Sequence, residues 1–312
     1  MKIAAIHNFL RVKARATGAF LDMMEALRNR GHEISIYTFD TSAEIRDSLK
    51  GDFNINSANF KELTSDFRYL RPLLELNNSL RLLPVCRGLA AKINEANFDL
   101  AFVDHYFYTP LILPYLKLPK VYYCYEPPRL AYEPSILWGR TYQLTKVIYT
   151  PQKYIDRHCV KFADLVLCNS DYIRQYIYRV YSIHAITNYL GVDLERYKRL
   201  ELEKENLIVC VGVMHSSKAQ DFCIRSIGMI PKDKRPKLLL ITSGVTYDIG
   251  YKQNLIKLAQ QNEVELELTK NLISHEEFVE WHNKAKVVAI PYIMEPSIEP
   301  VALACETPIV AV

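Results

Sequence analysis

The 312-residue sequence lacks the signatures of several large classes of protein. It contains no Gly-x-Gly-x-x-Gly motif, and this argues against an oxidoreductase that binds a dinucleotide. No apolar run approaches the roughly 18 residues that a membrane-spanning helix needs. Met1 leads directly into a strand-like pattern, so we expect no secretory signal. Together these absences predict a soluble chain.

The cysteines show no pattern that would indicate a metal site or a disulfide framework. None of them forms a Cys-x-x-Cys pair, and most lie singly inside apolar runs. Thiols of this kind are typical of reduced core residues, so we expect a cytoplasmic protein without a zinc site. The seven are Cys86, Cys124, Cys159, Cys168, Cys210, Cys223 and Cys305.

Composition and charge favour a globular chain of two ordinary domains. The hydrophobic content is 49%, and nothing in the sequence indicates disorder. The formal net charge of +4 is mild. It is compatible with anionic substrates or with a lipid surface and establishes neither, and we expect no nucleic-acid partner.

The chain alternates apolar strands with amphipathic helices. Residues 2–9 form an apolar run that ends in polar residues, as a buried parallel strand does. Apolar side chains recur at helical spacing over 20–27, Gly31 supplies a stop, and 34–39 is the next strand. The same order restarts at 206–213. This predicts an α/β protein with two doubly wound, Rossmann-like sheets that bind ligands at the carboxyl ends of their strands.

Two later helix starts carry side chains suited to capping. Asn169 and Ser170 follow an apolar strand, and either can accept the first free amides of the next helix. Ser274 and Glu277 have the spacing of a capping box.

Residues 295–312 contain the most informative motif of the chain. They read E-P-S-I-E-P-V-A-L-A-C-E-T-P-I-V-A-V. This stretch resembles the signature of family 4 of the retaining glycosyltransferases (GT4), usually written E-P-F-G-L-V-x-L-E-A-M-A-C-G-T-P-V-V-A. The resemblance implies a loop and helix start whose backbone amides face the diphosphate of a nucleotide-sugar donor. The matching residues are Glu295, Pro296, Ala304, Cys305, Thr307 and Pro308.

The match departs from the family pattern at charged positions. The family's second Glu, which holds the nucleotide ribose, falls at Val301 or Leu303, depending on the register. A shortening by two residues leaves Glu299 as the nearby substitute. The stretch 206–218 resembles the family's V-G-R-L-x-x-x-K-G, in which Arg and Lys grip the diphosphate. Lys218 is present, whereas Val213 occupies the Arg position.

Three stretches of the first half match the family at lower specificity. Gly18 stands where the family carries a glycine-rich turn beside the diphosphate, although a simple turn explains it equally well. His105 follows a buried strand at the position of a family histidine near the donor sugar, unless it is only a hydrogen-bonded loop residue. The stretch Y-C-Y-E-P-P-R is similar to a family motif and places Glu126 and Arg129 on the acceptor side, unless the two only brace the turn.

The resemblance therefore implies a GT-B architecture, with two facing domains and the active site between them. We expect an N-terminal, acceptor-side domain over 1–190, a linker over 191–205 and a nucleotide-sugar-binding domain over 206–312. The catalytic candidates are His105 and Glu295. The donor-binding candidates are Gly18, Gly212, Lys218, Ser297, Ile298 and Glu299.

The implied reaction is transfer of a sugar from a nucleoside diphosphate sugar, with retention, to a glycan, lipid-linked or small-molecule acceptor. No Asp-x-Asp motif occurs, so a metal-dependent layout has no support, and we expect neither a metal nor a cofactor. The alternative is a catalytically weakened accessory subunit that binds without turnover. Val213, the displaced second Glu and the end of the sequence inside an expected strand favour that alternative, and the last point also suggests a partial second domain.

Two apolar and basic stretches, 67–76 and 80–89, are candidates for amphipathic helices. On them Arg68, Arg71, Arg81 and Arg87 accompany leucines. Such faces bind anionic membrane surfaces, and this would place the protein at the inner face of a membrane. Packed surface helices with solvated arginines are the simpler interpretation.

Overall fold

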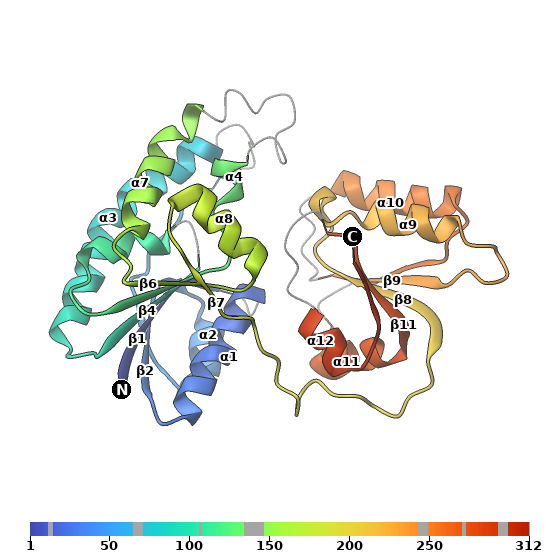
Figure 1. Cartoon of the computed structure of the whole chain (residues 1–312), viewed down its shortest axis with the longest axis horizontal. Helices are drawn as coiled ribbons and strands as arrows, with labels where there is room; N and C mark the ends of the chain where they lie inside the picture. Colours follow the sequence, from blue (N-terminus) through green and yellow to red (C-terminus); the bar gives the residue numbers. More distant parts are fainter. Residues whose placement is uncertain are drawn as a thin grey trace. The chain divides into compact units, whose positions relative to one another are not determined.

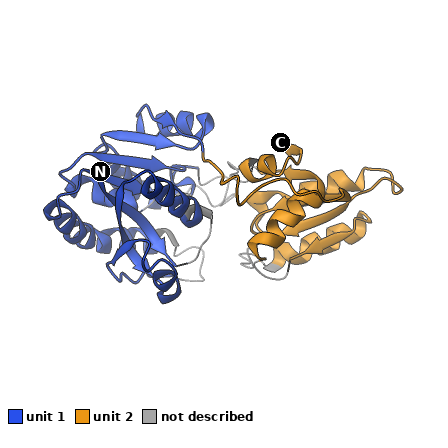
Figure 2. Cartoon of the chain, turned by 90° about the horizontal axis from the view of Figure 1, so that it is seen from below, with its two compact units in different colours: residues 1–189 blue, residues 190–312 orange. Residues whose placement is uncertain are grey.

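The chain folds into two compact units, Met1–Tyr189 and Leu190–Val312 (Figure 2). The structure is a computed structural model. It describes residues 1–11, 15–64, 71–105, 108–133, 147–242, 249–269, 273–292 and 299–311. Each unit is a parallel β-sheet with helices on both faces (Figure 1). The predicted α/β class is therefore confirmed.

The sheet of unit 1 has seven strands in the order β3-β2-β1-β4-β5-β6-β7. All neighbouring strands pair in parallel. The chain order reverses between β1 and β4, which is the place where doubly wound sheets bind ligands. The strands are β1 (Lys2–Leu10), β2 (Glu33–Thr41), β3 (Asn54–Ser57), β4 (Leu100–Asp104), β5 (Lys120–Cys124), β6 (Leu165–Cys168) and β7 (Ile186–Thr187).

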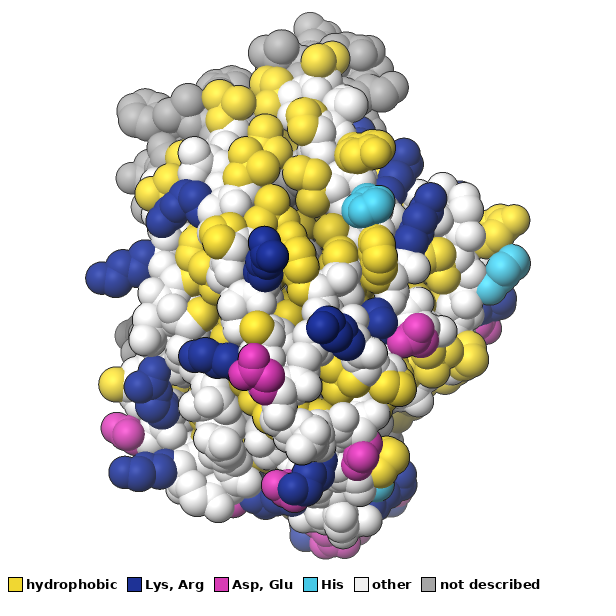
Figure 3. All heavy atoms as spheres, turned by 90° about the vertical axis from the view of Figure 1, so that its left-hand side faces the viewer, with side chains coloured by type: hydrophobic (Ala, Val, Ile, Leu, Met, Phe, Trp, Pro, Cys, Tyr) yellow, Lys and Arg dark blue, Asp and Glu magenta, His cyan; other side chains and the backbone are white. Residues whose placement is uncertain are grey.

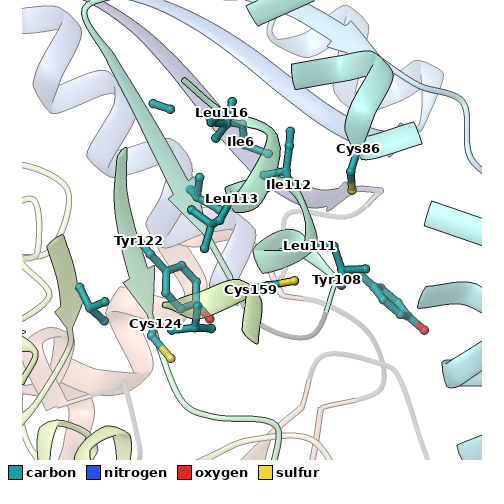
Figure 4. Packing of buried hydrophobic residues seen from close by; sticks show 14 of the residues in the cluster. Ile6, Cys86, Tyr108, Leu111, Ile112, Leu113, Leu116, Tyr122, Cys124 and Cys159 are labelled. Atoms are coloured by element: carbon teal, nitrogen blue, oxygen red, sulfur yellow. The ribbon is translucent and has the colours of Figure 1, made fainter. Parts of the chain in front are cut away.

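One face of this sheet packs against most of the helices of unit 1. Alternate strand residues such as Ile6 and Tyr122 share one buried cluster with Leu111–Leu113 (Figure 4). The opposite face packs against α1, whose Phe20 is fully buried. The helical elements are α1 (Arg15–Asn29), α2 (Ala43–Ser48), α3 (Arg71–Glu95), η2 (Thr109–Tyr115), α4 (Arg129–Tyr132), α7 (Thr150–Val160) and α8 (Asp171–Tyr181).

A single helix, α3, contains the described parts of both stretches that were predicted to be amphipathic. The polar residues between them do not end the helix, because they anchor it. The Asn78 amide accepts from Leu63 N and donates to Leu63 O, each at 2.9 Å. Ser79 Oγ donates to the Glu75 carbonyl at 2.8 Å. These hydrogen bonds satisfy the polar side chains inside the protein, so the helix does not have to end for them to reach water.

Unit 2 has five parallel strands in the order β10-β9-β8-β11-β12. Because side chains alternate along β8, Val209 packs with α11 and α12 while Cys210 packs with α9 and α10 on the other face. The elements are β8 (Glu205–Val211), η4 (Ser216–Lys218), α9 (Gln220–Gly228), β9 (Lys237–Ile241), α10 (Ile249–Gln261), β10 (Leu266–Leu268), α11 (His275–Lys284), β11 (Ala285–Ile290), α12 (Glu299–Ala304) and β12 (Ile309–Ala311).

The structure bears on several local expectations from the sequence, and it confirms two helix caps. Ser170 Oγ accepts from Ile173 N at 3.1 Å, and Ser274 Oγ accepts from Glu277 N at 3.1 Å, so both serines cap helices. All seven cysteines are buried and unpaired with one another. Among the residues that the structure describes, no helix combines the length and the apolar character needed to cross a bilayer.

Helix α12 ends in a Schellman motif at the position where the family signature has glycine. Thr307 N donates to Ala302 O at 2.9 Å and Glu306 N donates to Leu303 O at 3.0 Å. Glu306 therefore has a left-handed backbone, with φ of 53°. A side chain in this conformation costs about 1 kcal/mol relative to glycine. The ion pair of Glu306 with Arg199, 3.0 Å between Oε2 and Nη1, is exposed and offsets little of this cost.

We expect Glu306→Gly to raise the free energy of unfolding by about 0.5–1 kcal/mol, because it relieves the left-handed strain. Glu306→Gln is the matched control, since it removes the charge and keeps the strain. The control should lie within about 0.5 kcal/mol of wild type. Urea denaturation of the three proteins measures both differences. A destabilised glycine variant would contradict the assignment of strain to this position.

Asp156 on α7 is a buried carboxyl group on the opposite face of the sheet from α1. It accepts hydrogen bonds from the hydroxyls of Tyr132 and Tyr181, both at 2.8 Å. Burial raises the pKa of Asp156 from 3.8 to about 6, against the lowering effects of Tyr181, Tyr132 and Arg157. The folded state therefore retains a proton that the unfolded chain has released.

This raised pKa predicts a loss of stability as the pH increases. The contribution of Asp156 is fully present below pH 3.8 and is lost as the pH rises through about 6. We expect the free energy of unfolding of Asp156→Asn, relative to wild type, to increase by up to about 3 kcal/mol between pH 4 and 7.5. Chemical denaturation across this range tests the prediction. The exposed control Asp233→Asn should show no such trend, and a pH-independent difference for Asp156→Asn would refute it.

Candidate functional site

The switch point of unit 1 carries a buried pair of polar side chains. His7 near the end of β1 and Asp104 at the end of β4 have side chains that are 1% and 0% exposed. His7 Nδ1 and Asp104 Oδ2 are 2.7 Å apart. His7 Nε2 lies 3.3 Å from Thr17 Oγ1, and the His7 ring stacks on Phe20 with centroids 4.6 Å apart. The imidazole is therefore held on both nitrogens and on one face.

His105, the predicted catalytic residue, directly follows this pair. Its backbone is left-handed, with φ of 80°. Its ring stands nearly perpendicular to His7, with centroids 5.4 Å apart, and its centroid is 6.4 Å from that of Tyr125. The side chain is half-buried, so it lies at the carboxyl edge of the sheet with part of its surface open.

Asp104 connects His7 to the residue that follows β4. Burial raises the pKa of its carboxyl group, and the hydrogen bond with His7 lowers it in part. The net direction is upward. Asp104 Oδ2 thus holds the ring of His7 directly before His105 in the chain.

Arg129 forms ion pairs with Glu126 and Glu133 and is not open to a ligand. Arg129 Nε donates to Glu126 Oε2 at 2.6 Å, and Arg129 Nη1 donates to Glu133 Oε2 at 3.1 Å. The Arg129 side chain is 3% exposed, and its guanidinium lies 5.4 Å from the Tyr176 ring centroid. The geometry favours bracing of the Pro-Pro turn for Arg129, whose two carboxylate partners, Glu126 and Glu133, are partly exposed.

Gly18 lies inside the first turns of α1 and not in the loop that precedes a helix. A Cβ atom added at Gly18 would meet no other atom within 4 Å, so no close approach requires glycine there among the described residues. The helix starts earlier than predicted because Thr17 and Phe20 are both fixed against His7. Gly18 remains near the switch point, at the N-terminal end of α1.

Unit 2 brings Gly212, Lys218 and Tyr292 together at the carboxyl ends of the neighbouring strands β8 and β11. The Lys218 ammonium lies 4.2 Å from the centroid of the Tyr292 ring. A Cβ atom at Gly212 would stand 3.1 Å from the Tyr292 hydroxyl and 3.6 Å from Lys218 Cγ. The contact with the Tyr292 hydroxyl is tighter than an ordinary van der Waals contact, so this hydroxyl favours glycine at 212.

A tight turn fixes the position of Lys218. Lys218 N donates to the His215 carbonyl at 2.8 Å, and Ser217 N donates to His215 Nδ1 at 3.2 Å. Val213, at the family's Arg position, offers only its carbonyl, which accepts from Gln220 Nε2 at 2.9 Å. The turn therefore fixes the backbone at Lys218 without a charged side chain at position 213.

Three predicted residues, Glu295, Ser297 and Ile298, lie outside the described residues. Glu299 begins α12, and its side chain lies outside them too. In the described ranges, no group of three or more His, Cys, Asp or Glu side chains is arranged to hold a metal ion. The sequence did not single out His7, Asp104 or Tyr292 as site residues. Asp104 ends an apolar strand, Tyr292 follows one, and His7 is a polar residue inside one, and this was the available signal.

Comparison with solved structures identifies the fold. HepE from Anabaena in complex with UDP matches with a TM-score of 0.67 and 15% identity over 100% of this chain and 80% of that chain. Sucrose-phosphate synthase from Thermosynechococcus elongatus matches with 0.71 and 16% over 99% and 80%. A Listeria monocytogenes chain assigned as a UDP-N-acetylglucosamine 2-epimerase matches with 0.58 and 10% over 99% and 78%. The fold is GT-B, and the fold alone does not choose between transfer and epimerisation.

Family models distinguish sugar transfer from epimerisation. No curated protein sequence matches the chain. The model described as Glycosyltransferase Family 4 matches residues 19–196, more than half of the chain, and the model described as Glycosyl transferases group 1 matches residues 192–312. The chain therefore belongs to Glycosyltransferase Family 4 and is a glycosyltransferase.

Proposed function

We propose that this chain transfers a sugar from a nucleoside diphosphate sugar to a glycan, lipid-linked or small-molecule acceptor, with retention at the anomeric carbon. The observation that carries the proposal is the cradle formed by Gly212, Lys218 and Tyr292 at the edge of the second sheet. A relative of the same fold, HepE, was crystallised with UDP, and this supports a donor with a diphosphate.

The cradle has the properties that a departing diphosphate needs. Lys218 supplies a positive charge in a fixed turn, where solvent screens it less than in open water. Gly212 leaves the backbone accessible where a side chain would collide with Tyr292. Preorganised charge of this kind stabilises the transition state more than the ground state, because the negative charge on the diphosphate grows as the bond to the sugar breaks.

The remaining roles complete the reaction without a metal or a cofactor. We assign Glu295 to the donor sugar, with Ser297, Ile298 and Glu299 at the diphosphate and ribose. His105 assists at the sugar from the edge of unit 1, where it steadies developing charge. Lys218 and backbone amides take the place that a divalent cation has in metal-dependent enzymes.

Calorimetry with UDP, GDP and ADP tests the donor site. We expect one nucleotide to bind selectively and Lys218→Gln to weaken it by about 10- to 100-fold, because a charge-assisted contact to the diphosphate is lost. The matched control is Lys257→Ala, an exposed lysine on α10 of the same unit, which should bind as wild type does. Equal weakening by both variants, or no binding to the folded wild type, would refute the proposal.

A turnover assay separates the enzyme from the accessory-subunit alternative. Val213 in place of the family's Arg is the observation that favours the alternative. Hydrolysis or transfer of the selected nucleotide sugar, unchanged by EDTA, is expected of a metal-independent transferase. Nucleotide binding that depends on Lys218 without any turnover would favour the accessory subunit instead.

The outer face of α3 and α7 supports an acceptor held at an anionic membrane. The two helices contact one another, and on the side shown in Figure 3 apolar side chains gather with Lys and Arg among them. Leu80 and Tyr154 are 52% and 74% exposed. On the described parts of both helices the exposed charged side chains are basic except for Glu95. Apolar surface combined with positive charge fits a bilayer that contains anionic lipids.

Co-sedimentation with phosphatidylglycerol-containing vesicles tests this surface. We expect binding that falls with salt and is absent with neutral phosphatidylcholine vesicles, because screening removes the electrostatic part. Replacing Tyr154 and Phe162 together by Ser should weaken binding about tenfold or more, because two inserted aromatic side chains are lost. The control is Met229→Ser, which replaces an exposed methionine of unit 2. Unchanged binding of the double variant would refute the assignment.

A further inference from the structure

Burial of the polar side chains of His7 and Asp104 costs desolvation free energy. Both side chains are almost fully removed from water, at 1% and 0% exposure. Replacing a buried polar pair by apolar side chains of similar volume is often neutral or stabilising, because desolvation offsets the attraction. Packing against Phe20 and α1 therefore does not account for the pair by itself.

Asp104 immediately precedes His105 in the chain and is held by His7, with 2.7 Å between Asp104 Oδ2 and His7 Nδ1. His105 has a left-handed backbone, with φ of 80°, which costs a non-glycine residue about 1 kcal/mol or more. Such strain persists where the surrounding structure fixes the residue, and the locked side chain of the preceding Asp104 contributes to that.

His7 also sets the orientation of the His105 ring. The two rings meet at an interplanar angle of 88°, and Tyr125 meets His105 at 69°, so the ring stands between two aromatic neighbours. His7 cannot turn away without breaking its bond to Asp104, its contact with Thr17 and its stack on Phe20. The orientation of His105 consequently depends on a side chain that is itself locked.

We infer that His7 and Asp104 are positioning residues, which fix the backbone and the ring of His105 without touching the substrate. The inference rests on the proposed function, since it assumes that His105 acts at the donor sugar. It adds that the pair affects turnover only through His105. Small displacements of a catalytic group reduce rates strongly, so disturbing the pair lowers kcat and leaves donor binding intact.

A double-mutant cycle with the nucleotide sugar selected by calorimetry, beginning with UDP-glucose, tests this dependence. His7→Phe keeps an aromatic ring and removes the hydrogen bonds, and Asp104→Asn keeps the shape and removes the charge. We expect each to lower kcat about tenfold or more, with KM within about twofold of wild type. In a His105→Ala background the same changes should lower kcat by less than about twofold. Losses that multiply in that background, or an unchanged kcat, would overturn the inference.

Asp156→Asn is the matched control, because Asp156 is a buried aspartate that bonds to two tyrosines on the other face of the same sheet. Its kcat should equal that of wild type. Thermal unfolding of every variant identifies losses that arise from misfolding, and His7→Phe keeps the test open if Asp104→Asn does not fold.

A nuclear magnetic resonance experiment separates this inference from the proposed function. In wild type we expect His7 to carry its proton on Nδ1, and we expect the ring-proton signals of His105 to shift in Asp104→Asn, because the His7 ring that it contacts loses its fixed orientation. An Nε2-only tautomer of His7, or unmoved His105 ring signals, overturns the positioning role even in an active enzyme. Expected spectra together with no turnover of any nucleotide sugar would show that the proposed function, and not the geometry, is wrong.

Discussion

Parallel strand pairing is the constraint on which both candidate sites depend. When all neighbouring strands run in the same direction, every strand delivers its carboxyl end to one edge of the sheet. In unit 1 the pairing of β1 with β4 places His7 beside Asp104, the last residue of β4 and 97 positions later in the chain. In unit 2 it places Tyr292, after β11, against Gly212, after β8. The buried clusters of each sheet are mostly apolar, so polar residues that are remote in sequence gather toward this edge.

The sequence predicted the helices and strands better than it predicted which of them lie side by side. Strand and helix positions follow from local periodicity, and the caps at Ser170 and Ser274 follow from local side-chain chemistry, so these expectations were confirmed. The pairing of His7 with Asp104 requires β1 to lie beside β4, and no local pattern specifies strand order. The early start of α1 was missed for the same reason, since a contact of Thr17 with His7 across the fold stabilises it.

Two departures from the family signature differ in kind: one concerns the conformation of the backbone, and the other removes a charge. Glu306 takes the conformation that the signature assigns to glycine, and the Schellman hydrogen bonds form nonetheless. Val213 lacks the family's guanidinium, yet its carbonyl is held by Gln220 and the following turn still presents Lys218. A strain of about 1 kcal/mol is small beside the total stability of a domain, so the backbone tolerates such changes. A missing charge is different, because a backbone that keeps its shape does not replace the charge.

In the proposed reaction, the missing charge at position 213 affects the stabilisation of the leaving diphosphate. Backbone amides and one lysine stabilise a leaving diphosphate less than the same amides with a lysine and an arginine, because each fixed charge near the developing anion lowers the barrier. A weaker interaction with the leaving group raises the barrier, and the groups at the sugar then supply a larger share of the stabilisation that remains. There the correct placement of a single side chain contributes most when its movement is already restricted. His105, strained in its backbone and confined between His7 and Tyr125, meets that requirement.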